Sequence, residues 1–133
     1  MNFSILETER TNNFTDPAIQ TKIGSLWKRN AVTVQKVLKE GGTIACVYHD
    51  YQTDFKGDYS VSLCKEDYAS THFDTSNYQW KTYVVDSTDD LGIINTWHAI
   101  WLDEERGNIN RVYAFDFEQY NPNGEINILV AIH

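Results

Sequence analysis

One stretch near the C-terminus decides how the chain folds: DFEQYNPNGEINILVAI, from Asp116 to Ile132. Its middle, Asn121 to Gly124, favours a turn, because Asn, Pro and Gly each suit turn backbone conformations. The segment after the turn alternates, so the isoleucines and valine from Ile126 to Ile132 share one face that must be buried. The stretch is therefore predicted to form a hairpin, with Glu118 among aromatic neighbours just before the turn.

The strand before the turn carries two different faces. Alternation places Asp116, Glu118 and Tyr120 on one face, and Phe115 and Phe117 on the other. Tyr120 is therefore expected beside Glu118. On the closing strand, Asn127 and Leu129 are expected opposite the isoleucine face.

The rest of the first half shows strand and helix patterns in turn. Residues 3–7 open as a strand with an extension toward residue 14, and Asp16-Pro17 is a helix start. Apolar residues then recur at helical spacing up to about residue 30. Residues 32–40 fit either a second short helix or an irregular connection. Strands are predicted over residues 43–51 and 58–64.

The second half repeats this order. Residues 65–77 are polar and read as a linker, and residues 79–86 as a strand. Residues 87–90 resemble a capping box, with Asp in place of the usual Glu. A helix follows that carries Ile93, Ile94, Trp97, Ile100 and Trp101 and ends over residues 103–107. The final hairpin is predicted over residues 112–120 and 125–132.

The order of elements indicates an internal duplication. Each half, about 1–65 and 78–133, reads strand, helix, strand, strand, and has an aromatic-x-x-Tyr segment before a Gly-acid turn. Aligning these segments sets His49 in the first half against Glu118 in the second. The period of roughly 70 residues is too long for a solenoid repeat. The predicted fold is therefore α+β: tandem β-α-β-β repeats forming an antiparallel sheet with two main helices and pseudo-twofold symmetry, with a ligand cleft along the axis.

Composition sets limits on function. The chain of 133 residues suits a single domain, and its four Trp and eight Tyr suit either a ligand-contacting surface or an unusually aromatic core. The net charge of −8 argues against nucleic-acid binding, which needs a basic surface. The same charge favours cationic partners through long-range attraction, or serves only solubility.

Other classes of site have no pattern in the sequence. The cysteines, Cys46 and Cys64, lack CxxC or Cys/His spacing and are expected to be buried thiols. The four histidines lack metal-ligand spacing, and no Gly-x-Ser-x-Gly segment occurs, so no cofactor is expected. No segment reaches the ~20 apolar residues of a membrane span. Because the first residues also lack the regions of a secretory signal, a cytoplasmic protein is expected.

Several motifs stand in order along the chain: Ile23-x-x-Leu26-Trp27, Val47-Tyr48-His49-Asp50-Tyr51 before Gly57-Asp58-Tyr59, Trp97-x-x-Ile100-Trp101, Asp116-Phe117-Glu118-x-Tyr120 and Glu125-Ile126-x-Ile128. Together they resemble a known family, the bacterial GyrI-like, AraC-type effector-binding domain, which includes free-standing members carried as integron cassettes. The resemblance spans nearly the whole chain in the right order. In the family the closing strand carries a Tyr-Ile-Pro-like segment, where this chain has Ile128-Leu129-Val130.

The resemblance implies a hydrophobic central pocket that binds cationic, lipophilic drugs or dyes. The Glu of a Phe-Glu-x-Tyr-like segment at the pocket floor meets the cation, and here that residue is Glu118. Some family members carry a helix-turn-helix domain, for which this chain has no room, so it looks like a stand-alone binding module.

Physical chemistry favours the same ligand class. An isolated carboxylate in an apolar cavity is costly to keep charged, and a lipophilic cation supplies the missing countercharge. Aromatic faces add cation–π attraction of about 0.5–2 kcal/mol each. Such a site needs no hydrogen-bond code, so broad specificity is expected. The candidate ligand-binding residues are Glu118, Tyr120, Trp27, Trp97, Trp101, Tyr48 and Tyr83.

Three functions remain open at this point. The leading hypothesis is a non-enzymatic binder of cationic amphipathic molecules, acting as a sensor or sequestering protein. The second is a GyrI-like hydrolase of reactive electrophilic compounds, in which Glu118 and Tyr120 activate water. The third is a protein-partner module, such as a gyrase inhibitor or the effector half of a split transcriptional regulator. The oligomeric state is not fixed by any of these patterns.

Overall fold

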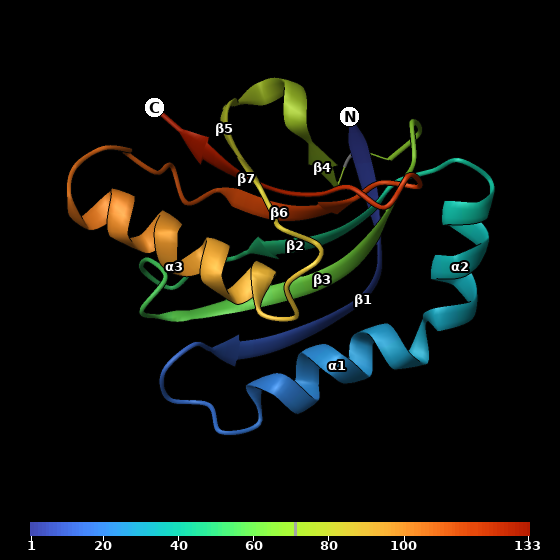
Figure 1. The fold of residues 1–133 in the computed structure, drawn as a ribbon, viewed down its shortest axis with the longest axis horizontal. Helices are drawn as coiled ribbons and strands as arrows, with labels where there is room; N and C mark the ends of the chain where they lie inside the picture. Colours follow the sequence, from blue (N-terminus) through green and yellow to red (C-terminus); the bar gives the residue numbers. More distant parts are fainter. Residues whose placement is uncertain (71) are drawn as a thin grey trace.

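The computed structural model describes residues 1–70 and 72–133 and has a mixed α+β fold (Figure 1). Three α-helices accompany one seven-stranded antiparallel sheet with the strand order β4-β1-β3-β2-β6-β7-β5. The elements are β1 (Asn2–Asn12), α1 (Ile19–Arg29), α2 (Ala31–Lys39), β2 (Ile44–His49), β3 (Asp58–Glu66), β4 (Phe73–Asp74), the 3-10 turn η1 (Thr75–Asn77), β5 (Gln79–Val84), α3 (Gly92–Glu105), β6 (Phe115–Tyr120) and β7 (Ile126–Ile132).

The two predicted hairpins, β2–β3 and β6–β7, are both present and meet at the centre of the sheet. β2 pairs with β6 in antiparallel register, with Cys46 opposite Glu118 and Val47 opposite Phe117. Outward from this junction, the order β2-β3-β1 on one side matches β6-β7-β5 on the other. The central β2–β6 pair therefore joins the first half of the chain to the second.

Both faces of the sheet bury apolar side chains. On one face α1 packs through Leu26 against β2 and β3, and α3 packs through Ile100 against Ile128 and Val130 of β7. The isoleucine face of the closing strand is thus buried, as its alternation predicts. The opposite face is filled by aromatic residues that include Phe117 and are joined by residues from β4 and the segment after it.

The helices differ from their predicted limits at their starts. Pro17 lies in a turn and α1 begins only at Ile19, since the Asp16 carboxylate accepts the Ala18 N–H at 2.9 Å and holds the turn. Residues 31–39 form α2, which resolves the open choice over that segment in favour of a helix.

The predicted capping box before α3 does not form. The helix begins at Gly92 without a side-chain cap. The aspartates of this loop close local turns instead: Asp86 accepts the Thr88 N–H, and Asp89 accepts the Leu91 N–H.

Several strand limits also differ from prediction, including that of the strand predicted over residues 79–86, which ends at Val84. The segment 65–77, expected as a linker, contains the end of β3, then β4 and η1. The strand predicted from residue 112 begins only at Phe115, since Tyr113 has a φ of 60°, which strand pairing does not accommodate. Likewise β2 ends at His49, because Asp50 has a φ of 54°.

His49 and Glu118 lie on opposite faces of the sheet, so aligning them across the duplication is wrong. His49 contacts Phe73 on the face that carries Phe117, with ring centroids 4.8 Å apart. Glu118 instead lies opposite Cys46, on the face covered by the helices. A shift of one residue reverses the face of every side chain in a strand, and the aromatic spacing does not fix that parity.

Two further expectations concern the cysteines and the membrane. Cys46 and Cys64 are both free and buried, and burial raises the pKa of the Cys64 thiol to about 12. Within residues 1–70 and 72–133, no helix combines the length and apolar character that crossing a membrane requires.

Candidate functional site

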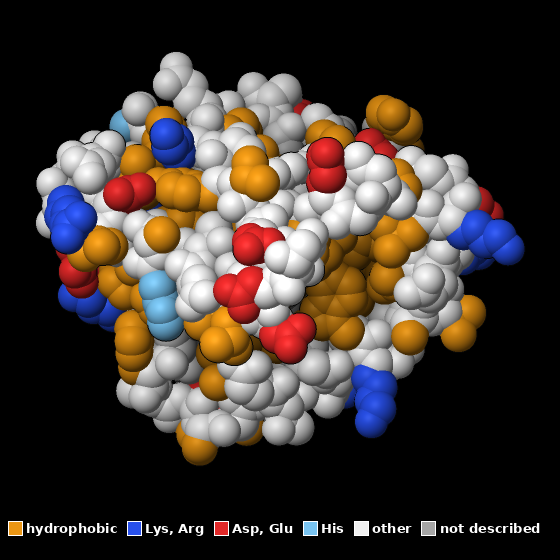
Figure 2. Space-filling view, in the orientation of Figure 1, with side chains coloured by type: hydrophobic (Ala, Val, Ile, Leu, Met, Phe, Trp, Pro, Cys, Tyr) orange, Lys and Arg blue, Asp and Glu red, His pale blue; other side chains and the backbone are white. Residues whose placement is uncertain are grey.

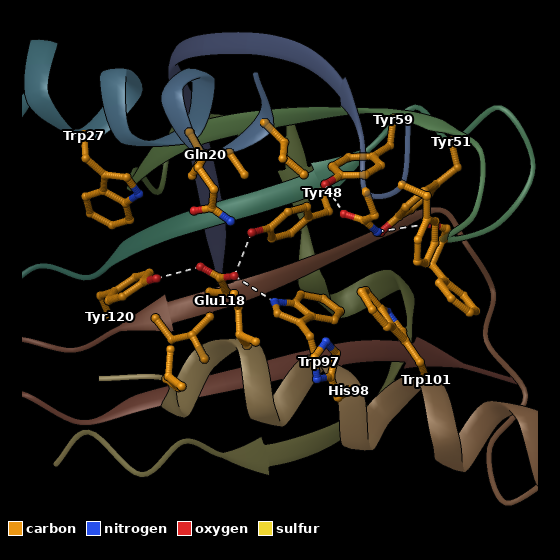
Figure 3. Close-up of a pocket in the computed structure, with 18 of the residues that line it drawn as sticks. Gln20, Trp27, Tyr48, Tyr51, Tyr59, Trp97, His98, Trp101, Glu118 and Tyr120 are labelled. Atoms are coloured by element: carbon orange, nitrogen blue, oxygen red, sulfur yellow. Dashed lines mark hydrogen bonds between the residues drawn. The ribbon is translucent and has the colours of Figure 1, made fainter. Parts of the chain in front are cut away.

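A cavity of about 470 Å³ lies between α1 and α3, over the helix-covered face of the sheet (Figure 3). Figure 2 shows a hollow with hydrophobic walls on this side of the molecule, with several acidic side chains exposed beside it. The walls come from Trp27 and its helical neighbours on α1, Trp97 and Trp101 on α3, and tyrosines of the sheet. The cavity is therefore built from both halves of the chain.

Glu118 forms the floor of this cavity and is only 4% exposed. The Tyr48 hydroxyl and the Trp97 indole N–H both donate to its Oε2, at 2.7 and 2.8 Å. The Tyr120 hydroxyl donates to its Oε1 at 2.6 Å. The carboxylate is thus held in one orientation by three donors that come from β2, α3 and β6.

All three donors to Glu118 are neutral groups. Burial, together with the neighbouring Cys46 and the Glu118 carboxylate, raises the pKa of Tyr48 well above its ordinary value. Burial and Glu118 do the same to the pKa of Tyr120. Both tyrosines therefore stay protonated and keep donating at neutral pH. Within the described chain, no Lys, Arg or His forms an ion pair with Glu118.

Aromatic rings surround the carboxylate. Trp27 meets Tyr120 edge-on with ring centroids 4.8 Å apart, and Tyr48 meets Trp97 edge-on at 5.1 Å. These contacts hold the rings in fixed orientations, because edge-to-face packing is a favoured aromatic geometry. The carboxylate thus lies among packed aromatic rings that also line the cavity.

A second carboxylate, Asp116, lies two residues before Glu118 on the same strand face and is fully buried. It accepts hydrogen bonds from Arg111 at 2.8 Å, from the Tyr51 hydroxyl at 2.6 Å and from the Ala131 backbone N–H at 2.9 Å. Burial alone would lower the pKa of Arg111, but the adjacent Asp116 raises it. This is an internal ion pair.

The other end of the cavity is apolar. Trp101 stacks on Phe55 with ring centroids 4.9 Å apart and an interplanar angle of 12°. Phe14, which is 61% exposed, lies 5.8 Å from Trp101 by ring centroids. Leu91 and Ile94 at the start of α3 also line the cavity while remaining exposed. An occupant therefore meets charge at the floor and apolar surface toward the mouth.

The structure brings six of the seven predicted residues to this cavity. Tyr83 is the exception: it lies on the edge strand β5, and its hydroxyl donates to Asp103 at 2.7 Å. Its ring packs against α3 with the β7 cluster, outside the cavity lining. The six that line the cavity are Glu118, Tyr120, Trp27, Trp97, Trp101 and Tyr48.

Sequence reasoning missed several lining residues. Arg111 precedes β6 in an irregular segment, where no periodicity indicates its direction. Tyr51 and Tyr59, in or near the first hairpin, also line the cavity, although they are not among the predicted ligand-binding residues. Gln20 lies on α1, and the spacing of Ile19, Ile23 and Trp27 on the same helix gave a signal for its cavity-facing side.

In the part of the chain that the structure describes, no group of three or more His, Cys, Asp and Glu side chains is placed to hold a metal ion.

Comparison with known proteins extends the picture at the level of fold. No protein-family model matches the chain, and no curated protein sequence matches it significantly. A similar solved structure is an integron cassette protein from the mobile metagenome of Vibrio cholerae, with a TM-score of 0.66 and 20% sequence identity. The match covers 99% of this chain and 95% of the other. At this identity the likeness concerns the fold alone.

Proposed function

We propose that this protein binds small, amphipathic, cationic molecules in the cavity between α1 and α3, as a sensor or a sequestering protein. One observation carries the proposal: Glu118 is buried at the floor of an aromatic cavity, with three neutral donors and no ion-pair partner among the described residues. A cation that enters the cavity supplies the countercharge that Glu118 lacks, because the guanidinium of Arg111, which also lines the cavity, is paired with Asp116 and Glu104.

The energetics favour a ligand with both charge and apolar surface. A buried carboxylate is costly without a partner charge, and a bound cation offsets that cost. The aromatic walls add cation–π attraction of about 0.5–2 kcal/mol for each well-placed ring. The apolar mouth around Phe14 and Leu91 then accommodates the hydrophobic body of the ligand. Neither the aromatic walls nor the apolar mouth requires a particular ligand shape, which supports broad specificity.

Charge outside the cavity supports the same ligand class. The chain carries a net charge of −8, which attracts cations over long range. Asp86, Asp89 and Asp90 are exposed in the loop before α3, and Asp90 lines the cavity. The resemblance of the sequence to GyrI-like effector-binding domains points in the same direction.

We also infer that the fold is a GyrI-like tandem of two β-α-β-β units related by a pseudo-twofold axis. The matching strand orders on the two sides of the β2–β6 junction support this inference. The axis would pass through the central pair, beside Glu118 and Cys46. The cavity then lies where the two units meet, a common position for ligand sites.

A thermal-shift screen tests the proposal. Cationic dyes of the rhodamine and acridine type are compared with neutral analogues of similar size, since a ligand of the native state raises the melting temperature. Cationic members should stabilise the protein, and Glu118→Gln should remove most of that stabilisation. Glu125→Gln is the matched control, because it removes the same charge from an exposed turn. Stabilisation by neutral compounds alone would contradict the proposal.

Hydrolysis of electrophilic small molecules is the second candidate function. The observation that favours it is the contact of Glu118 with two phenols, Tyr48 and Tyr120, which can position an acyl oxygen or a water. Turnover of an activated ester is the readout. For a hydrolase, Glu118→Gln abolishes turnover and leaves the binding of neutral substrate intact; for a binder, no turnover occurs and cation affinity falls.

A further inference from the structure

The hydrogen-bonding capacity of Glu118 is almost fully used by the protein itself. An ionised carboxylate offers about four acceptor positions, two on each oxygen. Oε2 already accepts from Tyr48 and Trp97, and Oε1 accepts from Tyr120. Only one position, on Oε1, is left for a ligand. The charge of Glu118 is therefore available to a ligand while most of its acceptor positions are not.

Close to Glu118 the lining offers few further acceptors for N–H groups. Among the other polar lining residues, Asp90 and His98 are exposed, and Asn13 Oδ1 already accepts from Tyr59. Figure 3 shows the Gln20 side chain projecting from α1 toward Glu118, which adds one neutral amide at the opposite side of the cavity. The nearest walls are the rings of Trp27, Tyr48, Trp97 and Tyr120. Aromatic cages of this kind suit alkylated ammonium groups, whose polarised C–H groups contact the ring faces.

We propose that the site selects cations by their number of N–H groups, and that it prefers tertiary ammonium, quaternary ammonium and N-alkylated delocalised cations over primary amines and guanidines. This inference rests on the proposed function. A primary ammonium brings three N–H donors and a guanidinium five, and each donor buried without an acceptor weakens binding. A tertiary ammonium brings one donor, which matches the single open position on Oε1. A quaternary ammonium brings none and needs only the charge.

A matched ligand series tests this selection by isothermal titration. Naphthylmethylamine, its N,N-dimethyl form and its N,N,N-trimethyl form share one aromatic body and one positive charge. The dimethyl and trimethyl forms should bind at least about tenfold more tightly than the primary amine, the order of effect expected for unpaired buried donors. A primary amine that binds equally or more tightly would overturn the inference.

A variant tests whether the preference for methylated ligands arises from the occupied acceptor positions of Glu118 or from the added apolar surface of the methyl groups. Tyr120→Phe removes the donor to Oε1 and opens a second acceptor position there. The preference for the methylated ligands should then narrow by about threefold or more. Tyr59→Phe is the control, because Tyr59 lines the cavity but its hydroxyl donates to Asn13 at 2.6 Å. The preference should stay unchanged in this control, and equal preferences in both variants would show that saturation is not the cause.

The outcomes also distinguish this inference from the proposed function. If all three ammonium ligands bind and lose affinity in Glu118→Gln, the site binds cations whatever its preference among them. If they bind with the primary amine tightest, only the selection by N–H number fails. If none of the series or of the cationic dyes binds, the proposed function fails, and this inference fails with it.

Discussion

Asp116 and Glu118 are two carboxylates on one face of one strand, both buried, yet the protein treats them differently. Asp116 has a guanidinium partner at 2.8 Å, a tyrosine hydroxyl and a backbone N–H. Glu118 has two tyrosine hydroxyls and an indole N–H, all neutral. Asp116 is neutralised within the fold, whereas Glu118 is oriented but not neutralised. The difference fits the proposal that Glu118 serves recognition, whereas Asp116 serves structure.

Removing each charge in turn gives the largest contrast. Asp116→Asn leaves Arg111 buried beside a weakened partner and should lower the free energy of unfolding by about 3–5 kcal/mol. Glu118→Gln leaves no buried cation behind, and the Tyr120 hydroxyl can turn to accept from the new amide. Its cost should be at most about 1 kcal/mol. Urea unfolding without ligand measures both values, and equal losses would contradict the division of roles.

Removing one tyrosine hydroxyl that donates to each carboxylate gives a smaller effect on the free energy of unfolding. Tyr51→Phe and Tyr48→Phe should each lower the free energy of unfolding by about 1.5–3 kcal/mol, the usual worth of a hydrogen bond to a charged group. The two variants should differ when naphthylmethylammonium is added. Tyr48→Phe frees an acceptor position on Glu118, so the ligand should raise its melting temperature more than that of the wild type. In Tyr51→Phe the ligand should raise the melting temperature as much as in the wild type. A larger rise than in the wild type in both variants would argue against separate roles for the two carboxylates.

Alkaline pH probes the donors. Burial and nearby carboxylates raise the pKa values of Tyr48 and Tyr120 above the unfolded value of about 10. Their contribution to stability is therefore fully present below pH 10 and is lost as the pH rises further. Each should contribute a slope of about 1.4 kcal/mol per pH unit above pH 10.

Urea unfolding between pH 8 and pH 11 measures this slope, and Tyr120→Phe should reduce it by one such increment. Tyr51 gives a useful comparison, because burial and Asp116 raise the pKa of its hydroxyl while Arg111 opposes the rise. An unchanged slope in Tyr120→Phe would mean that the pKa of this hydroxyl is not raised in the folded protein.

The smallest effect is expected at Tyr83. Its hydroxyl donates to Asp103 outside the cavity, so Tyr83→Phe should change the affinity for a cationic ligand by less than about twofold. Titration with the trimethylammonium ligand provides the measurement. A loss as large as that of Glu118→Gln would place the ligand elsewhere on the protein.

Alternation made part of the site predictable. Because side chains in a strand alternate, the sequence alone placed Tyr120 and Asp116 on the face of Glu118, and the structure agrees. Helical spacing likewise pointed to Trp97 and Trp101, which both line the cavity. In regular helices and strands, the sequence period thus indicates the direction in which each side chain points.

The partner of Asp116 was not predictable in the same way. Arg111 lies in an irregular segment next to Tyr113, whose positive φ breaks the strand pattern, so no period fixes where its side chain points. Short elements were missed for a related reason: β4 has two residues, too few to show alternation. The sheet faces on which His49 and Glu118 lie depend on strand register, which long-range pairing sets.

The central pairing of β2 with β6 has a consequence for how the protein opens. The cavity takes Gln20, Trp27 and Tyr48 from one side of that junction, and Trp97 and Glu118 from the other. A molecule seated in the cavity therefore adds a non-covalent cross-link between the two halves of the chain, beside the β2–β6 pairing and the aromatic contacts that already join them. Occupancy of the cavity should suppress partial opening of the β2–β6 pairing. Hydrogen exchange of the β2 and β6 backbone amides should then slow toward the rate of global unfolding.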